Sequence, residues 1–247
     1  MRYSLNGMDL IVPGTLKETV EWTVQAFLTY AQSSINASGL CKVALSGGKT
    51  PLVLFEAFAQ ISTQELWKGV EWFWNDERYV PIGHQKSNFG NAFHSLKALK
   101  GSSFFPMVHD ELLPPQQEAL LYAKRIGDKL PFDLSLLGLG EDGHIASLFP
   151  NHDVFLRQKE GLEKGEDDQM PLVEAFSVPG EGWRISLSLS PIVNSSSIWV
   201  FITGKEKSSI VKRVLCDEDT SLPARLLVGR KNVLFILDQD AFSSMDL

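Results

Sequence analysis

The sequence predicts an α/β protein with a doubly wound, mostly parallel sheet and helices on both faces. Short apolar runs, such as CKVALS (41–46) and VEWFW (70–74), alternate along the chain with longer amphipathic stretches. These runs are almost continuously hydrophobic, which is typical of strands covered on both faces. Several are followed by polar or glycine-rich clusters, and in such sheets ligands bind beyond the carboxyl ends of the strands.

The segment RISLSLS (184–190) alternates strictly between apolar and polar residues, which predicts a half-exposed strand. The stretches 51–61 and 205–215 are predicted helices, because each is amphipathic and follows a strand. Residues 157–170 are charged and glycine-spaced, so they are expected to form an exposed excursion. Without repeats or a linker, we expect one domain over residues 1–247. The predicted strands are 41–46, 70–74, 132–140, 184–190, 196–204 and 232–241.

Composition excludes several classes of protein. The net charge of −7 argues against a nucleic-acid partner, because phosphate backbones require clustered Lys and Arg. No apolar run approaches the roughly 20 residues of a membrane span, and the N-terminal residues lack the apolar core of a signal peptide. Cys41 and Cys216 form no C-x-x-C pair, so neither a disulfide scaffold nor a zinc site is expected. We expect a cytoplasmic protein, and both a monomer and a dimer are compatible with this sequence.

The segment LSGGKTP (45–51) lies between a predicted strand and a predicted helix. Gly47 and Gly48 permit a tight turn and the close approach of a ligand. Thr50 is expected as the N-cap and Pro51 as the first helical residue. Such a loop directs free backbone N–H groups at an anion such as phosphate. An ordinary, well-capped turn is the alternative, and the spacing does not match a Walker loop.

The segment WNDERYVP (74–81) places charged side chains at the end of an aromatic strand. Arg78 could bind a phosphate or a developing oxyanion. Asp76 could order the loop or bind a substrate hydroxyl. A surface cluster of salt bridges is the alternative interpretation. Ser87 and Asn88 follow closely and could start a helix.

The segment GLGEDGHIASLFP (138–150) has the G-x-G-x-x-G spacing of a dinucleotide site. That fingerprint requires an acidic residue at the end of a second strand roughly 20 residues further on. Here that region is the charged EGLEKGEDD (160–168), which cannot be a buried strand. A sharp turn that presents Asp142 and His144 remains. The imidazole suits a general base, and no H-x₃-H pair indicates a metal.

Two further cations follow or open predicted strands. Arg184 opens the alternating strand, and Lys207 lies in the predicted helix after ITG (202–204). Each alone is more often a solvated charge. Together with the 47–50 loop they could converge on one phosphate if the strand ends are neighbours.

With these segments in order, the chain resembles the 6-phosphogluconolactonases. LSGGKTP resembles the phosphate loop of that family, NDERYVP…SN its second motif, and GLGEDGHIASLFP its active-site signature. WRISLSLS, ITGKEKS and LPARLL…VLFILDQDA are similar to its later blocks. Two departures concern loop contacts: Asn75 stands where a small residue is common, and Gly182-Trp183 precede Arg184 where prolines are frequent.

The resemblance implies the NagB/RpiA/CoA transferase-like fold, shared with glucosamine-6-phosphate deaminases and ribose-5-phosphate isomerases. It implies hydrolysis of 6-phospho-D-glucono-1,5-lactone in the pentose phosphate pathway, without cofactor or metal. His144 would be the general base, and Asp142 would orient substrate, water or the imidazole. Arg78 would stabilise the oxyanion or the phosphate. The substrate and its phosphate would be held by Gly47, Gly48, Lys49, Thr50, Asp76, Arg184 and Lys207.

Two rival functions differ in their requirements. The deaminases carry D-G-H-I-A-F-N-E-P, whereas this chain has Phe149 in place of the glutamate, and Phe149 cannot transfer a proton. A sugar-phosphate sensor without catalysis could have lost its histidine, but His144 is present, and the chain has no spare length for a DNA-binding domain. The sequence therefore favours the lactonase.

Overall fold

The computed structural model describes residues 1–5, 8–61, 64–109, 112–217 and 219–245. The strands are β1 (Arg2–Leu5), β2 (Met8–Ile11), β3 (Cys41–Leu45), β4 (Val70–Trp74), β5 (Asp76–Arg78), β6 (Ser103–Phe104), β7 (Leu134–Leu137), β8 (Val173–Val178), β9 (Gly182–Leu187), β10 (Ser197–Ile202) and β11 (Val233–Leu237). The α-helices are α1 (Leu16–Ser38), α2 (Lys49–Ala59), α3 (Gln64–Lys68), α4 (Asn88–Leu96), α5 (Pro115–Gly127), α6 (Asp153–Lys164), α7 (Leu189–Val193) and α8 (Ser208–Leu215).

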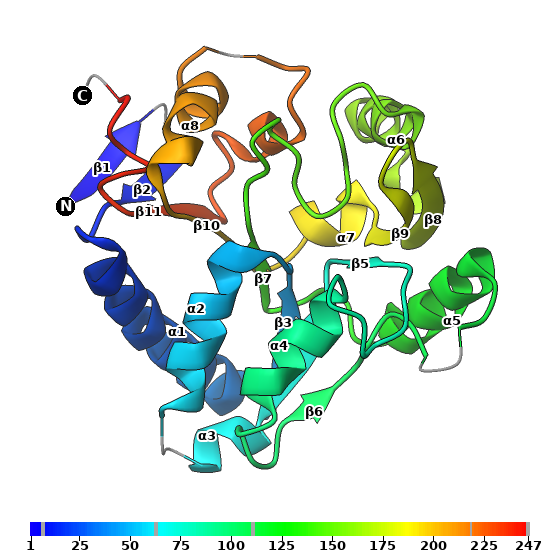
Figure 1. Cartoon of the computed structure of the whole chain (residues 1–247), viewed down its shortest axis with the longest axis horizontal. Coiled ribbons are helices and arrows are strands. Elements are labelled where there is room, and N and C mark those ends of the chain that lie inside the picture. Colours follow the sequence, from blue (N-terminus) through cyan, green and yellow to red (C-terminus); the bar gives the residue numbers. More distant parts are fainter. Residues whose placement is uncertain (6–7, 62–63, 110–111, 218, 246–247) are drawn as a thin grey trace.

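The large sheet has the order β1-β2-β11-β10-β7-β3-β4-β6, and all its neighbours except β1 and β2 are parallel. From β3 the chain continues outward through β4 and β6, then returns to β7 and continues outward on the other side. The topological switch point therefore lies between β3 and β7 (Figure 1). The predicted doubly wound, mostly parallel α/β fold is confirmed, and the site should lie at this point.

A second sheet of three antiparallel strands, β5-β9-β8, lies to the right of the central strands in Figure 1. The predicted strand 184–190 belongs to this sheet as β9, and the prediction that it is half-exposed is wrong. Residues 184–187 are all buried, because polar side chains in this strand face the protein interior rather than solvent. The strand ends at Leu187, and Leu189 begins α7.

Both faces of the large sheet are covered, as the run of apolar strand residues predicts. Successive strand residues point to opposite faces. Trp72 packs against Phe27 of α1 and Phe58 of α2, whereas the next residue, Phe73, packs against Phe105 and Phe132. The hydrophobic core therefore occupies two layers, one on each side of the sheet.

The charged segment 157–170 is largely exposed, as predicted, and much of it is helical. Residues up to Lys164 belong to α6, a helix anchored by the buried side chains of Phe155 and Gln158. Gln158 donates to Glu174 of β8 and accepts from the backbone N–H of Leu189.

Among the residues placed in the structure, no helix is long and apolar enough to cross a membrane.

Asn75, at the end of β4, connects the strands that meet at the switch point. Its side-chain amide donates to the carbonyls of Ala44 and Leu136, at 3.1 and 3.2 Å, and to Ser46 Oγ at 3.3 Å. Its backbone N–H donates to Leu45 of β3, and its carbonyl accepts from Leu187 of β9. Asn75 is fully buried. This departure from a small residue thus supplies donors to carbonyls of two neighbouring strands.

We expect Asn75→Ala to lower the free energy of unfolding by about 3 kcal/mol, because the hydrogen bonds of the buried amide are lost and a cavity forms. Urea denaturation measures the change. Asn91→Ala is the control, since the side chain of this exposed asparagine of α4 donates to Gln85 O at the surface, and its loss should cost less than about 1 kcal/mol. Equal losses in both variants would contradict a special role of Asn75.

Candidate active site

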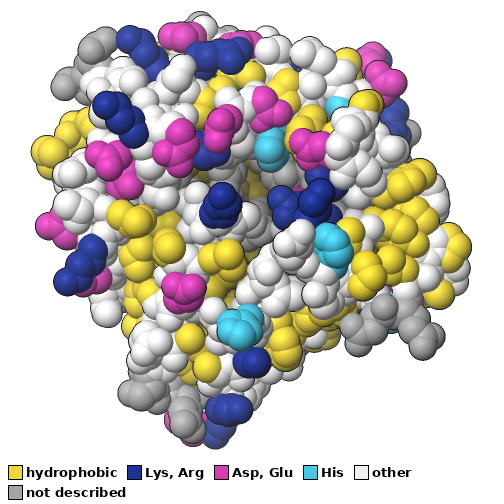
Figure 2. All heavy atoms as spheres, viewed as in Figure 1, with side chains coloured by type: hydrophobic (Ala, Val, Ile, Leu, Met, Phe, Trp, Pro, Cys, Tyr) yellow, Lys and Arg dark blue, Asp and Glu magenta, His cyan; other side chains and the backbone are white. Residues whose placement is uncertain are grey.

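A pocket of about 580 Å³ opens at the switch point. Its walls come from the loops after β3, β7 and β10 and from the small antiparallel sheet. Figure 2 shows the hollow near the centre of one face, with lysine and arginine side chains on one side and acidic side chains on the other. The position agrees with the general location of ligands in doubly wound sheets.

Every site residue proposed from the sequence lines this pocket. Their functional roles stay predictions, but their convergence is a property of the fold. They are Gly47, Gly48, Lys49, Thr50, Asp76, Arg78, Asp142, His144, Arg184 and Lys207. Sequence reasoning did not assign several other lining residues. These include Ser46, Asn88, Glu141, Ser147, Phe149, Glu181 and Glu206.

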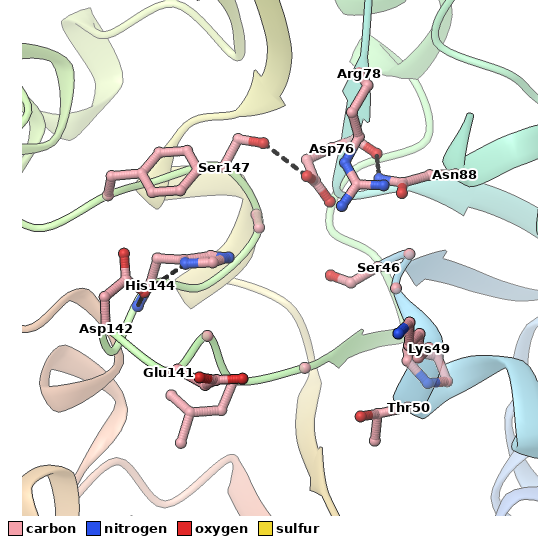
Figure 3. A pocket seen from close by; sticks show the side chains of 18 of the residues that line it. Ser46, Lys49, Thr50, Asp76, Arg78, Asn88, Glu141, Asp142, His144 and Ser147 are labelled. Atoms are coloured by element: carbon pink, nitrogen blue, oxygen red, sulfur yellow. Dashed lines mark hydrogen bonds and ion pairs between the residues drawn. The ribbon is translucent and has the colours of Figure 1, made fainter. Parts of the chain in front are cut away.

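The imidazole of His144 is oriented by Asp142. Asp142 Oδ1 lies 2.6 Å from His144 Nδ1 and also accepts the backbone N–H of His144 at 3.1 Å (Figure 3). Burial alone would raise the pKa of Asp142, but the hydrogen bonds and the charge of His144 outweigh it and lower that pKa. An ionised Asp142 accepts a hydrogen bond from Nδ1–H, so the proton stays on Nδ1 and Nε2 is the ring nitrogen able to act as a base.

Gly140 makes the close approach of this pair possible. A Cβ at residue 140 would lie 2.1 Å from His144 Nδ1 and 2.6 Å from Asp142 Oδ1. The backbone N–H of Gly140 donates to His144 O at 2.9 Å, so the turn closes on itself. The glycine in this motif thus serves the His–Asp pair rather than a dinucleotide.

Phe149 packs against the same imidazole. The two ring centroids are 4.6 Å apart, and the ring planes are inclined by 42°. The chain turns back between the two residues: Ala146 has a φ of 49°, and the N–H of Leu148 donates to Ile145 O. His144 is therefore contacted on its edge by a carboxylate and on its face by an apolar ring.

The N-terminus of α2 opens into the pocket without a side-chain cap. The prediction that Thr50 caps this helix is wrong, because the helix already begins at Lys49 and Gly48 is the capping residue. Gly48 has a φ of +103° and open space around its Cα, which suits close approach of a ligand. The first-turn amides and the positive end of the helix dipole thus face the pocket, an arrangement that favours an anion.

Gly47 has a different reason to be glycine. A Cβ there would lie 1.9 Å from Asn88 Oδ1, so the residue admits the side chain of Asn88 rather than a ligand. Asn88 is buried, and its amide donates to Asp76 O at 2.9 Å (Figure 3). Ser87 caps α4, as the sequence suggests, by accepting from the N–H of Gly90.

The buried carboxylate of Glu77 joins β5 to the start of α4. It accepts the backbone N–H groups of Asn88 and Phe89 at 2.6 and 2.8 Å, and the Ser87 hydroxyl at 3.1 Å. Complete burial raises the pKa of Glu77 to about 7, against the opposing effect of the N–H donors, and neighbouring Asp76 adds to the rise. This contact places Asp76 and Arg78, which flank Glu77, at the wall of the pocket.

Asp76 is held from the opposite wall. Ser147, which follows the His144 turn, donates its hydroxyl to Asp76 Oδ2 at 2.7 Å (Figure 3). The backbone N–H of Ser147 approaches Ser186 Oγ of β9 at 3.4 Å. Asp76 is only 5% exposed, yet it lines the pocket. The second sheet and the His144 turn are thus joined through a carboxylate.

Arg78 and Arg184 lie directly opposite each other in the β5–β9 pair. Like charges in this position are destabilising, so the arrangement favours an anion between or beside them. Burial lowers the pKa of Arg184, and the charge of Arg78 adds to this, while Glu181 and Asp76 oppose it. Arg78 donates to Lys86 O at 3.1 Å, which leaves further N–H donors on its guanidinium.

Lys207 completes the set of cations. Lys207 was predicted to lie inside the helix 205–215. It instead ends a 3₁₀ turn (Lys205–Lys207) just before α8. Its Nζ lies 3.9 Å from Glu141 Oε1, and its side chain is mostly buried. Among the side chains the structure describes, no group of three His, Cys, Asp or Glu is placed to hold a metal ion.

This fold and pocket define the chain as a doubly wound α/β protein with a His–Asp pair and a cluster of cations at its switch point. The chain belongs to the glucosamine-6-phosphate isomerase/6-phosphogluconolactonase family, which it matches over residues 15–236. The resemblance drawn from the motifs is therefore confirmed.

Individual relatives agree with this assignment. The chain is 32% identical to the 6-phosphogluconolactonase of Treponema pallidum over 213 residues, which cover 81% of this chain and 83% of the relative. It is 29% identical to that of Mycobacterium tuberculosis over 227 residues, 86% of this chain and 88% of the relative. The 6-phosphogluconolactonase structure from Trypanosoma brucei superimposes with a TM-score of 0.78 at 26% identity, covering 96% of this chain and 98% of the other.

The raised pKa of Glu77 predicts how stability depends on pH. The folded state holds this proton up to about pH 7, whereas an ordinary glutamate releases it near 4.5. The contribution of Glu77 to stability is therefore greatest below about pH 4.5 and falls by about 3 kcal/mol as pH rises to about 7.

Urea unfolding of the parent and Glu77→Gln between pH 4.5 and 8 measures this effect, because the variant lacks the titrating group. The difference in unfolding free energy between the two proteins should change between pH 4.5 and about 7 and then level off toward pH 8. Glu65→Gln is the control, since the Glu65 side chain is 85% exposed. A pH-independent difference for Glu77→Gln would contradict the prediction.

Proposed function

We propose that this protein hydrolyses 6-phospho-D-glucono-1,5-lactone to 6-phospho-D-gluconate, with His144 as the general base on water. One observation carries the proposal: the Asp142–His144 pair opens into the same pocket as the uncapped end of α2 and the opposed arginines. A base and an anion site in one cavity suit an uncharged carbonyl attached to a phosphate. The names of the relatives support this substrate.

The proposed reaction begins with water at the lactone carbonyl. His144 Nε2 accepts a proton from the water as its oxygen bonds to C1, and Asp142 stabilises the imidazolium through Nδ1–H. The tetrahedral intermediate carries its negative charge on the former carbonyl oxygen, where Arg78 is the proposed stabilising group. When the bond from C1 to the ring oxygen breaks, the imidazolium returns the proton to that oxygen.

The phosphate lies at the other end of the substrate from C1, and its binding would position C1 beside the base. The proposed phosphate ligands are the first-turn amides of α2 around Gly48, Lys49 and Thr50, with Arg184 and Lys207. Charge-assisted contacts to phosphate are strong and can hold the reacting end near the base. Asp76, anchored by Ser147, is proposed to bind a sugar hydroxyl through its remaining carboxylate oxygen.

The alternative reaction, deamination of an amino-sugar phosphate, needs a glutamate that this chain does not have at the corresponding position. A deaminase must open the ring and move a proton between C1 and C2, which requires acid–base groups beside the histidine. Phe149 occupies the position of the deaminase glutamate and packs on the His144 ring instead. We therefore propose that glucosamine-6-phosphate binds weakly through its phosphate and releases no ammonia.

The direct test is the hydrolysis of freshly prepared lactone by the purified protein, corrected for spontaneous hydrolysis. We expect His144→Ala to lower kcat by a factor of about 10²–10⁴ while KM changes little, because the phosphate contacts lie elsewhere in the pocket. His94→Ala, at an exposed position of α4, is the control. A kcat for His144→Ala within threefold of the parent would exclude the general-base role.

A second test concerns the glycines of the turn. Gly140→Ala should lower kcat about tenfold or more, because its Cβ would separate His144 from Asp142. Gly138→Ala is a matched control in the same loop, since a Cβ at Gly138 meets nothing within 4 Å. Circular dichroism should show that both variants are folded. Retention of full activity by Gly140→Ala would show that the His–Asp contact is dispensable.

A further inference from the structure

Glu181 lies in the tight turn between β8 and β9, at the rim of the pocket. Its neighbours Gly180 and Gly182 have φ angles of +78° and +83°, in the left-handed region that glycine adopts readily. Its N–H donates to Val178 O at 3.0 Å. The side chain is 54% exposed, yet it folds back onto Arg184, whose side chain is 8% exposed. An exposed carboxylate thus contacts a buried cation of the site.

The backbone would hold Arg184 in place without that carboxylate. Arg184 Nη1 donates to Glu181 O at 2.8 Å and to Trp183 O at 3.4 Å, whereas Nη2 forms the ion pair with Glu181 Oε2. The two backbone carbonyls therefore orient the guanidinium through Nη1, and the carboxylate takes a donor of Nη2, which the carbonyls leave free. That Nη2 donor is one that an incoming anion would use.

The charges around Arg184 explain why a carboxylate is placed there. Arg184 lies opposite Arg78 in the β-ladder, and two neighbouring cations in a partly buried position repel each other. Asp76 and Glu181 bring two negative charges to the two arginines, and both raise the pKa of Arg184. A bound phosphate dianion would supply the same two charges by itself, and it would repel the carboxylate of Glu181.

We infer that Glu181 is an internal counter-ion that occupies the anion site on Arg184 and that a phosphate group displaces it on binding. Arg184 cannot withdraw, because it is buried and held by backbone carbonyls, whereas Glu181 can rotate into solvent from its turn. Displacement costs binding energy, so Glu181 sets the affinity of the site. It also favours ligands with two negative charges over monoanions, which compete less well with a tethered carboxylate. This inference rests on the proposed function only for the identity of the phosphate-bearing ligand.

Titration calorimetry with inorganic phosphate tests the inference without reference to turnover. Glu181→Gln should bind phosphate about tenfold more tightly than the parent, and Glu181→Ala should behave similarly, because each variant removes the competing charge. Glu206→Gln is the matched control: it removes one negative charge from the same pocket, and its affinity should change less than about threefold. Unchanged or weaker binding in both Glu181 variants would overturn the inference and make Glu181 a support for Arg184.

Lactone kinetics separate this inference from the proposed function. If the parent hydrolyses the lactone, Glu181→Gln should lower KM by about the same factor as the phosphate Kd. If the parent does not hydrolyse the lactone, the proposed function fails, and tighter phosphate binding by the Glu181 variants still supports the counter-ion. An unchanged KM together with unchanged phosphate affinity would reject the counter-ion while leaving the lactonase intact.

Discussion

The side-chain amide of Asn75 joins β3 and β7, the two strands that pair at the topological switch point. A buried backbone carbonyl that lacks a hydrogen-bond donor is costly. Asn75 donates to Ala44 O and Leu136 O, one on each strand. The start of α2 follows β3, the His144 turn follows β7, and both line the pocket. The hydrogen bonds of Asn75 therefore join the two strands from which these parts of the site extend.

The small antiparallel sheet brings the second half of the site to this opening. Glu77 ties β5 to α4, and Ser147 ties the His144 turn to Asp76. Both contacts place a carboxylate inside the protein, where it is surrounded by donors rather than water. The sheet then presents Arg78 and Arg184 side by side. The same construction concentrates positive charge at the pocket and requires the counter-ions Asp76 and Glu181 nearby.

The placement of a site residue could be predicted from the sequence wherever it depends on the local segment. Asp142 and His144 share one turn, and Gly48 is the capping residue of α2, so their motifs predict their positions directly. Asn88 meets Gly47 only in the folded protein, because the two residues lie 41 positions apart. The contacts of Phe149 with His144 and of Glu181 with Arg184 are local, but they depend on turn conformations that the residue pattern does not specify. The Thr50 cap failed as a prediction because helix starts shift by a residue or more, according to which backbone conformation the preceding glycines adopt.

The sequence by itself determined the α/β class, most of the strands and the motifs that carry polar side chains, because apolar periodicity and turn residues act over a few positions. Only the tertiary structure decided that residues 184–187 belong to the small sheet and are buried. The alternation of polar and apolar residues is the same whether the polar side chains face water or a pocket. It also decided that Arg78 lies opposite Arg184. This strand pairing joins two residues that lie more than a hundred positions apart, and a local sequence pattern does not specify its register.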